Sequence, residues 1–179
     1  MKTDKTEQHA STHGSETLSG RGSEWRRWDP HLHAPGTLFN NQFSGDWNEY
    51  LAKIERADPP LSALGVTDYF CIRTYKQALL HKAAGRLPNV ELIFPNVEIR
   101  LDLRTERQRS VNLHLLFSPD DPNHVREIES YLARLECEFH EHAWRCTEQS
   151  LTELGRLLVP TQKDEFAALR AGANQFKVT

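Results

Sequence analysis

The chain has 179 residues and a mass of 20.6 kDa, which is enough for one domain of ordinary size. Its 38% hydrophobic and 26% charged residues are typical of a globular protein and exclude a collagen-like or fibrous one. The formal net charge of −3 argues against nucleic-acid binding through bulk positive charge, and no apolar run approaches the roughly 18 residues of a membrane-spanning helix. The 3 cysteines are too few for a disulfide scaffold, which favours a reducing, cytoplasmic compartment.

The first part of the chain differs in composition from the rest. Residues 1–23 contain only Met1, Ala10 and Leu18 as apolar side chains and lack the apolar stretch of a secretory signal. Such a segment buries too little surface to offset the entropy of ordering it. We therefore expect a disordered tail over residues 1–23 and a single folded domain over residues 24–179.

Predicted strands and helices alternate along the folded part. The apolar patterns predict strands at residues 28–33, 61–67, 90–94, 97–103 and 111–117. Helices are predicted at residues 46–57, 72–84 and 121–135. Asp46 is predicted to cap the first helix, Pro95 to end the third strand, and Thr147 and Thr161 to cap two further helices. This alternation indicates an α/β architecture.

The strongest local pattern is Trp28-Asp29-Pro30-His31-Leu32-His33. Residues two apart in a strand share a face, so His31 and His33 project side by side. Two imidazoles placed in this way can bind one metal ion, or each can bind one ion of a pair. The alternative is a pair of surface histidines on an edge strand.

Two acidic residues and a third histidine extend this pattern. Asp68 ends a buried apolar strand, where α/β folds place their sites, although it also fits a helix cap. Glu98 and His114 lie on the polar faces of their strands, and each alone also fits a solvated sheet face. A hairpin turning near Arg107 would make Glu98 and His114 roughly diagonal neighbours.

Two other clusters need an interpretation. The first is a set of arginines that flank the predicted hairpin: Arg100, Arg104, Arg107 and Arg109. These arginines could contact phosphates, but the acidic residues among them favour an ordinary solvated loop. Four possible zinc ligands lie close together at a spacing that matches no usual zinc finger: Cys137, His140, His142 and Cys146.

The order of these motifs resembles the PHP superfamily of metal-dependent phosphoesterases, which begin with an Asp-x-His-x-His strand. The matching residues are Asp29, His31, His33, Asp68, Glu98 and His114. More specifically, residues 22–117 are similar to the amino-terminal PHP segment of the TrlF family, which precedes a long SMC-like ATPase region. The sequence segments on which this similarity is based include Leu64-Gly65-Val66-Thr67-Asp68-Tyr69-Phe70 and Phe94-Pro95-Asn96-Val97-Glu98.

The resemblance implies phosphoester hydrolysis with divalent metal ions (Zn, Mn or Fe), on a nucleic acid or a phosphomonoester. It implies four metal ligands: His31, His33, Glu98 and His114. It also implies that Asp68 is a further ligand or a base that orients water. Asp29 would hold an imidazole in the right tautomer. An ATPase domain or subunit is the implied partner.

Two departures from the family pattern limit this hypothesis. Tyr69 stands where most PHP proteins have a histidine, and a phenol is a poor ligand near neutral pH. The later histidine and Asp-x-His motif of the family do not follow His114. We therefore expect the amino-terminal part of a distorted (β/α)7 barrel, incomplete in its later motifs. Two alternatives stay open: a catalytically incomplete PHP module that binds an ATPase or another chain, and a zinc-stabilised nucleic-acid-binding module.

Overall fold

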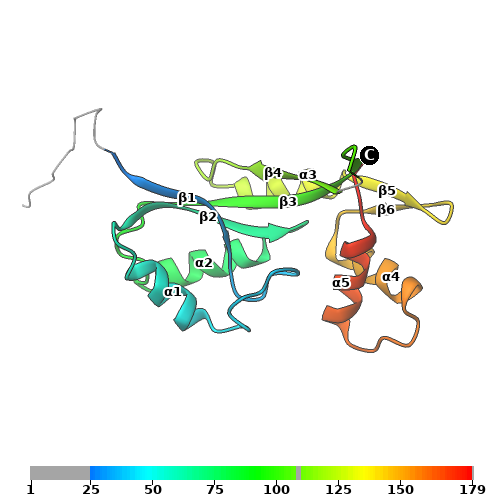
Figure 1. Ribbon diagram of the computed structural model, residues 1–179, viewed down its shortest axis with the longest axis horizontal. Coiled ribbons are helices and arrows are strands. Elements are labelled where there is room, and N and C mark those ends of the chain that lie inside the picture. The colour runs from blue at the N-terminus through cyan, green and yellow to red at the C-terminus, as the bar shows by residue number, and fades with distance from the viewer. Residues whose placement is uncertain (1–24, 108–109, 179) are drawn as a thin grey trace, which may run out of the picture.

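The computed structural model describes residues 25–107 and 110–178, so the tail predicted over residues 1–23 lies outside the described residues. The described residues form a mixed α/β fold of five helices with a curled four-stranded sheet (Figure 1). Helices α1 and α2 lie below the sheet in this view, and a hairpin and two helices follow at the carboxyl-terminal side. No helix in this part of the chain is long and apolar enough to cross a membrane.

The main sheet has the strand order β1-β2-β3-β4. Its strands are β1 (Arg27–His33), β2 (Leu61–Tyr69), β3 (Leu92–Arg104) and β4 (Ser110–Leu116). The first three run parallel, whereas β4 returns antiparallel to β3, which confirms the hairpin predicted near Arg107. The carboxyl ends of β1 and β2 therefore meet the middle of β3 and the second half of β4 at one edge of the sheet.

The remaining elements cover the sheet or extend beyond it. They are α1 (Trp47–Glu55), α2 (Arg73–Ala83), α3 (His124–Leu132), β5 (Glu136–Phe139), β6 (His142–Arg145), α4 (Glu148–Leu158) and α5 (Glu165–Gln175). The predicted caps of α1 and α4 are confirmed, since the Asp46 carboxylate and the Thr147 hydroxyl each accept a backbone amide of the first turn. The β5–β6 hairpin was not expected from the apolar pattern.

Two predicted helices have other boundaries in the structure. Asp164, not Thr161, caps α5, and its carboxylate accepts the Ala167 amide at 2.6 Å. The third helix begins at His124 and ends at Leu132, inside the predicted residues 121–135. Asp121 instead closes the preceding turn, where its carboxylate accepts the Asn123 amide at 2.6 Å. Asp164 thus replaces the expected cap of α5, whereas Asp121 forms a turn before α3 and does not cap the helix.

The strand predicted to end at Pro95 continues through it. Pro95 pairs with Val66 in the parallel β2–β3 ladder, and its carbonyl accepts the Phe117 amide at 3.1 Å on the β4 side. A strand residue directs its nitrogen and its carbonyl to the same side, so the missing donor of Pro95 lies just past the last β3–β4 pair, Asn96 with Leu116. The proline therefore ends the β3–β4 pairing at this point without interrupting the β2–β3 ladder.

The carboxyl-terminal helices pack on each other and on the end of β2. A Cβ added to Gly155 of α4 would lie 1.8 Å from the Ala168 carbonyl oxygen of α5, so the two helices touch backbone to backbone. The Phe176 ring lies 5.4 Å from that of Phe70, which follows β2 directly. These contacts bring α5 near the edge of the sheet where the strands β1 and β2 end.

Candidate metal centre

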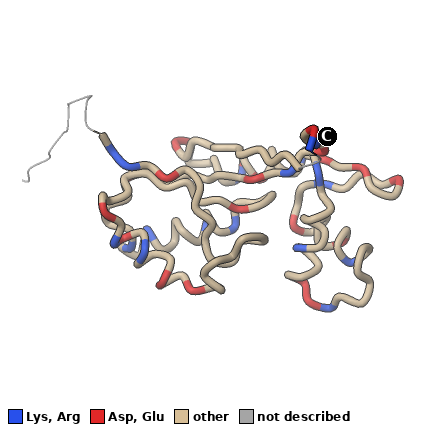
Figure 2. Tube along the Cα trace, in the orientation of Figure 1, with Lys and Arg blue, Asp and Glu red and all other residues tan. Residues whose placement is uncertain are grey.

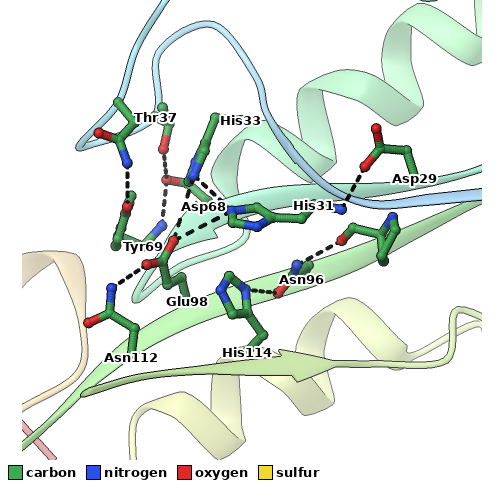
Figure 3. A network of polar contacts seen from close by, with 12 residues as sticks. Asp29, His31, His33, Thr37, Asp68, Tyr69, Asn96, Glu98, Asn112 and His114 are labelled. Carbon is green, nitrogen blue, oxygen red and sulfur yellow. Dashed lines mark hydrogen bonds and ion pairs between the residues drawn. The ribbon is translucent and has the colours of Figure 1, made fainter. Parts of the chain in front are cut away.

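Polar side chains from all four strands of the main sheet gather on one face (Figure 3). Tyr69, Glu98 and His114 lie in one row across the sheet, because Glu98 pairs with Tyr69 on one side and with His114 on the other. Glu98 and His114 are thus direct partners, not the diagonal neighbours expected from the sequence. Direct antiparallel partners project on the same side and lie closer together than diagonal ones.

Three candidate ligand atoms lie at distances that suit one metal ion. His31 Nε2 is 3.0 Å from His33 Nε2, and Glu98 Oε2 is 3.8 Å from the first and 3.6 Å from the second. Ligand atoms bound to one ion at about 2.1 Å lie about 3.0 Å apart at right angles and about 3.4 Å apart at tetrahedral angles. The observed distances therefore require only small movements for joint coordination.

His114 joins these residues from β4. One ligand atom each of His31, Glu98 and His114 lie within 4.8 Å of one another. The rings of His31 and His114 have centroids 4.4 Å apart. The four ligands implied by the resemblance, His31, His33, Glu98 and His114, are therefore brought together, and we refer to them as the His/Glu group.

The carboxylate of Glu98 is oriented and incompletely satisfied. Glu98 is 4% exposed, and its Oε1 accepts a hydrogen bond from Asn112 Nδ2. Its Oε2 is buried and has no hydrogen-bond partner among the described residues, while it faces the nitrogens of His31 and His33. A buried carboxylate oxygen without a partner is unfavourable, and a cation at this position would satisfy it. The donor set therefore fits a divalent metal.

A buried amide controls the third histidine. Asn96 Nδ2 donates to the Pro30 carbonyl at 2.8 Å, so Asn96 Oδ1 faces His114 Nδ1 at 3.1 Å and accepts from it. A proton on Nδ1 leaves the lone pair on Nε2 free for a metal, which is the usual arrangement behind a ligating histidine.

The environment favours the neutral form of two of the imidazoles. Burial lowers the pKa of His33, and the neighbouring His31 lowers it further. Burial also lowers the pKa of His114, although Glu98 opposes this effect. Neutral imidazole is the form that binds metal, so both shifts favour coordination near neutral pH.

Tyr69 packs against the group and stays protonated. Its ring stacks on that of His33, with centroids 5.3 Å apart and an interplanar angle of 8°. Its hydroxyl accepts a hydrogen bond from Asn40 Nδ2 at 2.8 Å, and burial raises its pKa well above the ordinary value. Tyr69 is therefore a neutral phenol whose ring packs against the imidazole of His33 and restricts its orientation.

The hydrogen bonds of the two predicted catalytic aspartates go to groups other than the imidazoles. The buried Asp68 carboxylate accepts hydrogen bonds from the Thr37 hydroxyl at 3.0 Å and from the Thr74 amide, in the first turn of α2, at 3.3 Å. Its placement matches the helix-cap interpretation, and its role as ligand or base stays a prediction. Asp29 Oδ1 accepts the main-chain amide of His31 at 3.2 Å, so its contact is to the backbone and not to an imidazole.

Sequence reasoning missed the two asparagines that orient the group. Asn96 precedes Glu98 by two residues, and Asn112 precedes His114 by two, so strand alternation places each on the same face as its ligand. That spacing was the signal that could have identified them.

The alternative zinc cluster is not assembled in the described residues. Cys137 and Cys146 are buried, whereas His140 and His142 are exposed on the β5–β6 hairpin. Within residues 25–107 and 110–178, the one group of three or more possible metal ligands that lie close together is His31, Glu98 and His114. None of the four residues of the predicted zinc cluster belongs to it. The four residues are close in the sequence, but the β5–β6 hairpin exposes His140 and His142 while the thiols of Cys137 and Cys146 are buried in the core.

Comparison with known proteins adds no family to this description. No family model matches the chain, and no curated protein matches it. The fold defines a mixed α/β protein, and the functional proposal depends on the His/Glu group and its surroundings.

Proposed function

We propose that this chain is a metal-dependent phosphoester hydrolase of the PHP type, with the His/Glu group as its divalent-metal site. The observation that carries the proposal is the buried, unpartnered Oε2 of Glu98, which lies 3.6 to 3.8 Å from two imidazole nitrogens. Imidazole and carboxylate ligands suit Zn, Mn or Fe. When bound, such an ion stabilises charge on phosphoryl oxygens and lowers the pKa of a water molecule.

The chain's own residues have distinct parts in this proposal. His31, His33 and His114 supply nitrogen donors, and Glu98 supplies one negative charge that partly offsets the charge of the ion. Asn112 holds the Glu98 carboxylate from β4. The substrate is a phosphomonoester or a nucleic acid.

The first test is the metal content of the purified chain, measured by plasma mass spectrometry. We expect near-stoichiometric Zn, Mn or Fe that is lost in the His31→Ala/His33→Ala variant. The matched control is His140→Ala/His142→Ala, which removes an exposed His-x-His pair from the β5–β6 hairpin and should retain the metal. A chain that holds no metal overturns the proposal. Metal lost only in the control variant would instead support the zinc-stabilised nucleic-acid-binding module.

A second candidate is a catalytically incomplete PHP module that binds an ATPase or another chain. The observation that favours it is the sheet itself: in the described part of the chain, β1 and β4 are both edge strands. After His114, the described residues form α3, a separate hairpin and the α4–α5 pair, and they add only an isolated bridge from Val178 to Leu101 to this sheet. A (β/α)7 barrel needs further strands to close.

Hydrolysis assays separate the two candidates. The metal-loaded chain is incubated with an aryl phosphate and with a single-stranded oligonucleotide, beside the His31→Ala/His33→Ala variant. Turnover that disappears in the variant supports the hydrolase. Stoichiometric metal without turnover of either substrate supports the incomplete module.

A further inference from the structure

Arg100 lies beside the His/Glu group on the same face of β3. It follows Glu98 by two residues, so both side chains leave the strand on one side. Its guanidinium carbon lies 4.6 Å from the ring centroid of Phe39 and 6.0 Å from that of Tyr69. Since Tyr69 stacks on His33, one aromatic ring contacts both the guanidinium and a candidate metal ligand.

A second arginine reaches the same aromatic ring from another element. Arg170 of α5 places its guanidinium carbon 5.8 Å from the Phe39 centroid. The helix is held toward β3 by Asn174, one turn further on, whose Oδ1 accepts a hydrogen bond from Arg100 Nη1 at 2.7 Å. Helix α5 and strand β3 therefore converge on Phe39 with one guanidinium each.

Within the part of the chain that the structure describes, these two positive charges have no carboxylate partner. Elsewhere, Lys and Arg are interspersed with Asp and Glu along the chain (Figure 2), and several cations form ion pairs, as Arg86 does with Glu55. Among the described residues, neither Arg100 nor Arg170 forms an ion pair. Two like charges around one ring repel each other unless an anion balances them.

We propose that Arg100 and Arg170 bind a phosphate group of the substrate next to the His/Glu group. The guanidinium fork matches two phosphate oxygens at once, and stacking on aromatic rings holds it in a fixed orientation. The identification of the ligand as substrate phosphate rests on the proposed function, which it deepens. Both arginines contact the substrate phosphate and do not contact the metal.

The test measures binding of inorganic phosphate to the full chain by calorimetry, first without metal and then with Mn²⁺. The Arg100→Gln/Arg170→Gln variant is expected to raise the phosphate dissociation constant about tenfold or more, because charge-assisted hydrogen bonds are lost. The matched control is Arg134→Gln, which removes an arginine 5.7 Å from the Tyr131 ring and should leave phosphate binding unchanged. Equal phosphate affinity in the wild type and the double variant, or no binding by the wild type, overturns the proposal.

Further variants separate a binding role from a structural one. Arg170 is exposed, so Arg170→Gln alone tests the site if the double variant does not fold. Arg100→Lys keeps the charge without the fork and should restore part of the affinity. Metal content is measured for each variant: unchanged metal with weakened phosphate binding supports the arginine site. Phosphate binding by a chain that takes up no metal would refute the proposed function while retaining this site.

Discussion

Asn96 connects the main chain of β1 to the imidazole of His114. Its Nδ2 donates to the Pro30 carbonyl at 2.8 Å, and its Oδ1 accepts from His114 Nδ1 at 3.1 Å. Because Pro30 immediately precedes His31, one buried amide fixes the approach of two candidate ligands from strands that are not neighbours in the sheet. The positions of these ligands therefore depend on a side chain that is not itself a ligand.

Replacing this amide should weaken the site without removing a ligand. In Asn96→Leu, we expect metal affinity to fall about 10- to 100-fold, since the His114 tautomer is no longer held. We also expect a loss of about 1–3 kcal/mol in the free energy of unfolding, because the Pro30 carbonyl loses its donor. Calorimetric metal titration and urea unfolding measure the two effects, with the exposed Asn89→Leu as control. Undiminished metal affinity in Asn96→Leu would contradict the assigned role.

Glu98→Gln should separate stability from metal binding. The neutral amide can donate to the imidazole nitrogens that now face the unpartnered Oε2. Without metal, we expect the free energy of unfolding of the variant to equal that of the wild type or to exceed it by about 1 kcal/mol. When metal is supplied, the variant should bind little of it. Strong destabilisation of the metal-free variant would show that the Glu98 charge serves the fold instead.

Gly65→Ala should disturb the site through the backbone of β1. A Cβ at this position would lie 2.1 Å from the Pro30 carbonyl oxygen, and neither backbone can move without shifting the β1–β2 pair. We expect a loss of about 1–3 kcal/mol in stability from overpacking and a weaker metal site, because His31 follows Pro30. Thermal unfolding and metal titration measure both effects. Ser62→Ala, in the same strand, is the control and should change neither value appreciably.

Glu55 should make stability depend on acid pH. Its carboxylate accepts hydrogen bonds from the Arg86 guanidinium at 2.8 and 2.9 Å and from the Leu87 amide at 2.9 Å, and the Arg86 contact chiefly lowers its pKa. The resulting stabilisation is present above the ordinary glutamate pKa of about 4.3 and is lost as pH falls through the lower folded-state value.

The matching variant is Glu55→Gln. At neutral pH it should be less stable than the wild type by up to about 1 kcal/mol, since the pair is partly exposed. The difference should shrink below about pH 4, where the wild-type carboxylate also becomes neutral. Urea unfolding at both pH values measures this, and a difference that does not depend on pH would rule out the charged contact as its cause.

Local pattern in the sequence was sufficient for much of the fold. The capping residues Asp46 and Thr147 were predicted correctly because a cap depends on a side chain and an amide three residues apart. The pairing of His31 with His33 and the polar face of Glu98 also follow from strand alternation. These features depend on neighbouring residues alone, so the sequence carries them directly.

The tertiary structure decided which polar residues meet. The register of β4 against β3 places His114 opposite Glu98, and the packing of α2 against β2 places the Asp68 carboxylate in contact with the Thr74 amide. The approach of α5 to β3 brings the guanidinium groups of Arg170 and Arg100 to the ring of Phe39. Each depends on contacts between residues far apart in the chain, which are fixed by how the core packs as a whole. Sequence periodicity specifies the face of a strand, but only the packed core specifies its partners.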